Sequence, residues 1–205
     1  MLDVLLEKFD FIEPNNTTLK IIIGQSPYKQ KLGSIPLKVS VNRTVNPVYN
    51  NFSEVAFLVN DWIKVQDSLE MIFNLFCRPN ISLKMISYLK SNNISPIQFA
   101  DFLFERYKIV LVNHFDSNEN SQQSIILNLI NRYPSCDVYV LFVGEKTSFQ
   151  LPQSRNIMKA RALHPSGKVL NTNTSGYYDT WYNLNNSALK NISPNFTLDI
   201  FRIIN

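Results

Sequence analysis

Four short apolar runs, each followed by glycine or polar residues, set the pattern of the chain. They cover residues 19–23, 108–112, 137–143 and 158–163. Largely apolar runs of this length, bounded by turn residues, are typical of buried strands in a parallel sheet. Because segments with helical spacing separate the four runs, we expect right-handed crossovers and parallel strands. The predicted fold class is α/β, a three-layer α/β/α sandwich with a four-stranded parallel sheet.

Apolar residues spaced three and four apart predict the helices around these strands. The predicted helices span residues 2–12, 52–75, 82–90, 97–107, 124–132 and 179–190. Ser95 followed by Pro96 is typical of a helix N-cap with proline in the first turn. Residues 29–45 show no helical spacing, which predicts a long loop, and long loops often serve a function. The absence of repeats or a composition shift favours one domain over residues 1–205.

The composition narrows the class of protein. The chain has 205 residues, 45% of them hydrophobic, which is enough for one sizeable core. A net charge of +4 permits a polyanionic partner without requiring one. Cys77 and Cys136 lie among apolar residues, which predicts reduced thiols and neither a disulfide framework nor a metal site. Charge interrupts residues 1–8, and no run approaches the roughly 18 apolar residues of a membrane span, so we expect an intracellular protein without membrane association.

Polar residues follow the predicted strands in a way that favours a shared site. Gln25, Asn113 and His164 each come directly after an apolar run. The carboxyl ends of parallel strands meet at one edge of the sheet, where α/β proteins bind their ligands. The plainer reading is that an asparagine after a strand is a turn residue, and that a lone histidine such as His114 or His164 is structural.

Four short motifs lie at these strand ends. The first strand ends in Gly-Gln-Ser-Pro-Tyr at residues 24–28, and the second ends in Asn113. The third ends in Gly144, and the fourth leads into His-Pro-Ser at residues 164–166. In this order the motifs resemble those of the uracil-DNA glycosylase superfamily, in particular its divergent viral members, over residues 19–168.

The resemblance implies a role for each residue. Enzymes of this kind extrude a base from the stack and read its edge in a pocket. Asn113 would pair with the uracil edge, Gln25 would lie beside it, and Tyr28 would exclude the thymine methyl group. His164 would donate a hydrogen bond to the O2 oxygen as negative charge develops on the leaving base. The DNA-binding residues implied are Ser166, Gly167 and Lys168. The family reaction uses no metal and no cofactor.

The departures from the family pattern fall on the chemistry. Ser26 stands where the family has the aspartate that orients water and stabilises the cationic sugar, and its loss costs on the order of 10² to 10⁴ in rate. Counting from Gly24 without a gap places Val39 at the uracil-stacking phenylalanine, and Lys168 stands where a leucine enters the duplex. Asp116 and Glu145 are the acids that could replace the missing carboxylate, although such residues more often cap helices or face water. Divergent members of the superfamily work without an aspartate in this motif, so Ser26 is compatible with activity.

Three functional hypotheses follow. The leading one is a divergent uracil-DNA glycosylase-like protein that binds DNA, with base excision weak or lost and a role as an accessory subunit in replication or repair. The alternative is an active monofunctional uracil-DNA glycosylase that hydrolyses the N-glycosidic bond. The third is a protein-interaction module with a vestigial pocket. The first two predict uracil-containing or single-stranded DNA as a partner, a replication protein as a further partner, and a nuclear or cytoplasmic site of DNA replication.

Overall fold

The computed structural model describes residues 17–27, 36–39, 47–60, 79–144, 147–153 and 157–164. The helices expected at residues 2–12 and 179–190 lie outside these ranges, as does Cys77. Cys136 is outside any disulfide and packs partly against the core. Among the helices of the described residues, none is long and apolar enough to cross a membrane.

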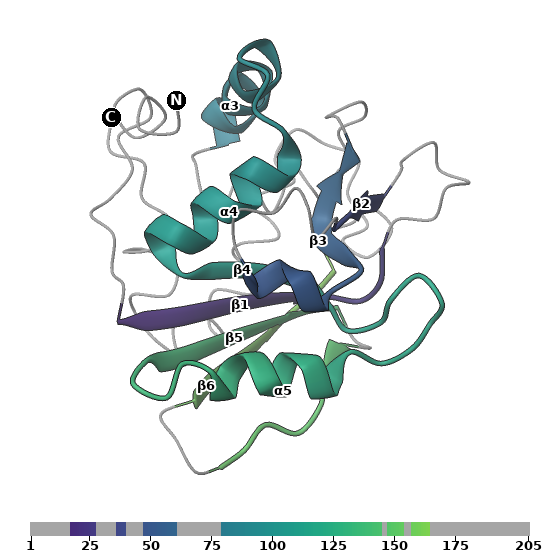
Figure 1. Ribbon diagram of the computed structural model, residues 1–205, viewed down its shortest axis with the longest axis vertical. Coiled ribbons are helices and arrows are strands. Elements are labelled where there is room, and N and C mark those ends of the chain that lie inside the picture. The colour runs from purple at the N-terminus through teal and green to yellow at the C-terminus, as the bar shows by residue number, and fades with distance from the viewer. Residues whose placement is uncertain are drawn as a thin grey trace.

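A four-stranded parallel sheet forms the centre of the described structure (Figure 1). Its strands are β1 (Thr18–Gly24), β4 (Ile109–Asn113), β5 (Asp137–Val143) and β6 (Ile157–Ala162), in the order β4-β1-β5-β6. These are the four strands that the apolar runs predict, and the parallel pairing confirms the predicted sheet. Every residue of β1 and β4 is buried, as expected for parallel strands with both faces covered.

Three helices occupy segments where helices are predicted. They are α3 (Pro79–Ser91), α4 (Pro96–Tyr107) and α5 (Gln123–Asn131), and α4 lies against β4 (Figure 1). Ser95 caps α4 as expected. Its hydroxyl accepts a hydrogen bond from the Gln98 amide at 3.3 Å, and the Gln98 side chain accepts one from the Ser95 amide at 2.8 Å. This reciprocal capping box satisfies two amides that the first turn would otherwise leave unpaired.

The helix predicted at residues 52–75 is wrong over its first part. Residues Glu54–Val59 form strand β3, which pairs antiparallel with β2 (Pro36–Lys38) inside the segment expected to be a loop. All six residues of β3 are buried, and β3 contacts both β4 and α4. A short, continuous apolar run fits a buried helix and a buried strand equally well, so burial on all sides decided for the strand. Residues 61–75 lie outside the described ranges.

Lys20 is a buried cation in the middle of β1. Its side chain is 2% exposed, and its ammonium donates a hydrogen bond to the Tyr107 carbonyl oxygen at 2.9 Å. This carbonyl lies at the end of α4, where the helix dipole favours a positive charge. Burial nevertheless lowers the pKa of Lys20 to about 8, because desolvation disfavours the charged form.

Candidate functional site

The carboxyl ends of the four parallel strands bring the predicted site residues to one edge of the sheet. Gly24 is the register partner of Asn113 on the neighbouring strand. Gly144 follows β5, and His164 comes two residues after the end of β6. Asn113 ends β4 and His164 follows β6, with β1 and β5 lying between those two strands. The edge therefore has an asparagine half and a histidine half.

The asparagine half is built around Gly24, whose missing side chain leaves room for two neighbours. A Cβ atom on Gly24 would lie 2.9 Å from Oδ1 of Asn113 and 3.0 Å from Cζ of Phe57. Both distances are shorter than ordinary van der Waals contacts. Glycine is therefore needed here for close approach, and the Asn113 amide and the Phe57 ring lie beside one another above the end of β1.

The Asn113 side chain has an unused hydrogen-bond donor. The residue is 1% exposed, and its Nδ2 has no hydrogen-bond partner among the described residues. A buried amide donor without a partner costs on the order of 1–3 kcal/mol. Such a group in a native protein calls for an explanation, and a ligand with an acceptor oxygen provides one.

Phe57 is a site residue that sequence reasoning missed. Its backbone has φ 63°, a left-handed conformation that is uncommon for a bulky aromatic residue, and its side chain is 8% exposed. Backbone strain of this kind, on the order of 1–3 kcal/mol, clusters at functional sites. Val39, which counting without a gap selected, packs partly against the core, whereas the atoms nearest to the Gly24 Cβ position belong to Asn113 and Phe57.

A sequence signal for Phe57 did exist. Phe57 is the aromatic residue of the apolar run at residues 55–59, and an aromatic ring offers a surface on which a base can stack.

The histidine half is built around Gly144, which has φ 105°. A Cβ atom on Gly144 would lie 3.6 Å from both Cβ and Cδ2 of His164. The Gly144 amide donates to the Ala162 carbonyl oxygen at 2.9 Å, and the Thr147 hydroxyl donates to the Gly144 carbonyl oxygen at 2.7 Å. Burial lowers the pKa of His164 below its usual value, so the imidazole is neutral at neutral pH.

Backbone and side-chain hydrogen bonds hold the loop after Asn113 against the end of β1. The His114 and Phe115 amides donate to the carbonyl oxygens of Gly24 and Gln25, at 2.8 and 2.9 Å. Gln122, which is buried, donates from Nε2 to the Asn113 carbonyl oxygen at 3.1 Å. The backbone that carries Asn113 is thus fixed from two sides, which keeps its amide in one position.

His114 is buried and belongs to an aromatic cluster. Its ring stacks on Phe115, with centroids 4.2 Å apart, and lies 5.2 Å from the Phe149 ring. Phe149 in turn meets Phe142 edge to face at 5.3 Å. This packing accounts for His114 as a structural residue that supports the loop.

Asp116, a candidate to replace the missing carboxylate, lies in the loop after β4. Asp116 Oδ1 accepts hydrogen bonds from the Asn118 and Asn120 amides, both at 2.9 Å, and Oδ2 accepts one from Asn120 Nδ2 at 3.2 Å. The bonds from Asn120, with that from Asn118, lower the pKa of Asp116 below its usual value. The Asp116 carboxylate therefore stabilises the turn of its own loop, which leaves it poorly suited to replace the missing carboxylate.

The other predicted site residues lie either at the end of β1 or outside the described residues. Ser26 is exposed and Gln25 is half-buried at the end of β1. The remaining candidates lie outside the described residues, namely Tyr28, Glu145, Ser166, Gly167 and Lys168. Within the described ranges, no three His, Cys, Asp or Glu side chains are grouped closely enough to hold a metal ion.

Comparison of the chain with protein-family models, with curated proteins and with solved structures finds no match in any of the three. Any functional proposal for this protein therefore rests on the residues and geometry of the strand edge.

Proposed function

We propose that this protein is a divergent uracil-DNA glycosylase-like DNA-binding protein, with a retained base pocket and with base excision weak or lost. The observation that carries the proposal is the buried Asn113 amide beside the Phe57 ring. Both approach Gly24 so closely that a side chain at this position would collide with them. The proposed fold is the three-layer sandwich of that superfamily, and the parallel sheet supports it.

The chemistry of the asparagine half fits a flipped pyrimidine. Asn113 Nδ2 is a buried donor that none of the described residues pairs with, and a uracil carbonyl oxygen would accept its hydrogen bond. The same amide offers an acceptor oxygen for the uracil N3–H, and this donor–acceptor pair discriminates against cytosine, whose pattern is reversed. The Phe57 ring provides the aromatic surface on which the base stacks, worth about 1–3 kcal/mol.

The histidine half fits a stabilising role toward the base. His164 is partly buried, and its lowered pKa keeps it neutral, so the imidazole acts as a hydrogen-bond donor rather than a cation. Such a donor stabilises negative charge on a leaving oxygen when it is held in place beforehand. Gly144 has φ 105°, a left-handed conformation that favours glycine, and this conformation forms the turn that packs against His164.

The missing carboxylate favours binding over excision. Ser26 is neutral, so it cannot balance positive charge on the sugar. Asp116, the candidate replacement that the structure describes, is engaged by three hydrogen bonds within its own loop. An active glycosylase remains the second candidate function, with Glu145, which lies outside the described residues, as the remaining candidate carboxylate.

The test is single-turnover release of uracil from a single-stranded oligonucleotide at excess protein. Single strands remove most of the cost of flipping and favour weak chemistry. We expect no release or slow release by the native chain, and release by Ser26→Asp that is at least tenfold faster. Native release at the rate of an ordinary glycosylase, abolished by Asn113→Ala, would establish the active enzyme instead.

Binding separates the proposal from the third hypothesis, the interaction module. We expect the affinity for a uracil-containing single strand to fall as salt rises, because phosphate contacts release counterions. Phe57→Ala should weaken binding of this strand by roughly tenfold or more through the lost stacking. The matched control is Phe104→Ala, which removes a buried phenylalanine of α4 that packs on Tyr133 and should leave the affinity of the folded fraction unchanged. DNA binding that is absent, or insensitive to salt and to Phe57→Ala, would refute the proposal.

A further inference from the structure

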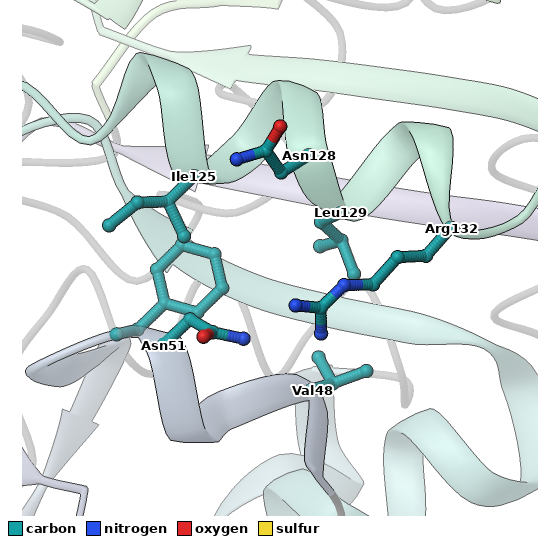
Figure 2. A pocket seen from close by; sticks show the side chains of 7 residues that line it. Val48, Asn51, Ile125, Asn128, Leu129 and Arg132 are labelled. Carbon is teal, nitrogen blue, oxygen red and sulfur yellow. The ribbon is translucent and has the colours of Figure 1, made fainter.

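A concave surface lies between the 3-10 helix η2 (Pro47–Asn51) and helix α5, and we call it the η2–α5 cleft (Figure 2). It encloses about 150 Å³. Its apolar lining includes Val48, Phe52 and Leu129, all of which are buried. None of these residues takes part in the strand-edge site, so the cleft is separate from the proposed function and does not depend on it.

The polar groups of the cleft come from both sides. Asn51 extends from η2, Asn128 from α5 and Arg132 from the C-cap of α5, with the Arg132 side chain reaching toward Val48 (Figure 2). All three residues are exposed. No ion pair links Arg132 to an acidic residue in the part of the chain that the structure describes. The cleft therefore combines an apolar floor, two carboxamides and one cation.

The size of the cleft limits what it can hold. Sites for drug-sized molecules and cofactors enclose about 300–1,000 Å³, well above the volume found here. A cavity of 150 Å³ holds a group of about the size of a benzene ring, such as one apolar side chain. A guanidinium beside it selects a carboxylate, because its planar donors match two carboxylate oxygens. Carboxamides supply a donor and an acceptor, which suit a peptide backbone.

We propose that the η2–α5 cleft docks a peptide segment of a partner protein that presents one apolar side chain beside a carboxylate. The apolar side chain occupies the floor over Val48, Phe52 and Leu129. The carboxylate pairs with Arg132 at the rim, and Asn51 and Asn128 contact the peptide backbone. This surface gives the protein a protein partner at a site that shares no residue with its strand edge.

The experiment titrates the full-length, isotope-labelled protein with acetyl-Gly-Glu-Phe-Glu-Gly-amide and follows backbone amide signals by NMR. We expect saturable shifts at residues 48–52 and 125–132. Two comparison peptides, with alanine for phenylalanine and with lysine for glutamate, should each bind at least tenfold more weakly, because each loses one of the two interactions.

Charge reversal of the protein completes the test. Arg132→Glu should lose the acidic peptide and gain the lysine peptide, whereas Arg106→Glu, the same charge change at an exposed position of α4, should leave both affinities unchanged. Thermal melting checks that both variants are folded, and Arg132→Met provides a neutral variant that keeps the side-chain stem. The proposal is overturned if no saturable shift appears at millimolar peptide, or if the two charge variants bind alike. It is also overturned if phenylpropionate binds as tightly as the peptide, which would make the cleft a small-molecule site.

Discussion

Replacing Lys20 with methionine should change how the stability of the protein depends on pH. The folded-state pKa of Lys20, about 8, lies below the usual 10.5, so the folded protein loses the Lys20 proton at a lower pH than the unfolded chain does. Between these values the unfolded chain binds more protons, and the free energy of unfolding of the native protein therefore rises with pH. Each pKa unit is worth about 1.4 kcal/mol, so the buried charge costs about 3 kcal/mol near neutral pH. Integration over about pH 7 to about pH 9.5 gives a gain of about 2 kcal/mol.

Methionine is suited to this test because it has an unbranched stem that fills the same buried space without a charge. Urea unfolding of the native protein and of Lys20→Met, at several pH values over this range, measures both free energies. The other titrating groups cancel in the difference, which should move in favour of the native protein by about 2 kcal/mol. The substitution also removes the hydrogen bond to the Tyr107 carbonyl, which shifts the difference by a constant amount. Lys84→Met, at an exposed position of α3, is the matched control. A difference that stays flat within about 0.5 kcal/mol, a quarter of the expected change, would refute the reasoning about Lys20.

Three further predictions concern the cap of α4, the glycine of the site and the loop after β4. Ser95→Ala should lower the free energy of unfolding by about 1 kcal/mol, because it removes the side chain that accepts from the Gln98 amide; an unchanged urea midpoint would contradict the capping role. Gly24→Ala should lower the free energy of unfolding by about 1–3 kcal/mol and abolish uracil binding, because its Cβ would press on Asn113 and Phe57. Chemical denaturation measures the first effect and DNA binding the second. Normal binding by a folded variant would argue against the pocket. Asp116→Asn should shift the NMR signals of the Asn118 and Asn120 amides, and acid should do the same to the native protein. The lowered pKa means that the ionised carboxylate holds the loop above the usual carboxyl pKa and releases it as the pH falls through the folded value; signals that ignore both changes would contradict this role.

Much of the framework follows from the sequence, because it depends on local chemistry. A short apolar run bounded by turn residues, with helical segments before and after it, favours a buried strand, and β1, β4, β5 and β6 lie where such runs occur. The capping box at Ser95 needs only residues three apart in the chain. For the same reason Asn113 and His164 could be assigned to one edge, since the carboxyl ends of parallel strands point the same way.

The tertiary structure decided whatever depended on neighbours distant in the chain. Residues 54–59 became a strand because β4 and α4 bury them on all sides, and their apolar pattern does not distinguish that outcome from a helix. Phe57 lies beside Gly24 and Asn113 because its strand, β3, pairs antiparallel with β2, and the sequence predicted neither strand. The burial of Lys20 and the engagement of Asp116 were likewise set by packing and loop geometry. A sequence specifies which side chains must be buried. Which of these side chains contact one another is determined only when the helices and strands pack together, because a densely packed core admits few other arrangements.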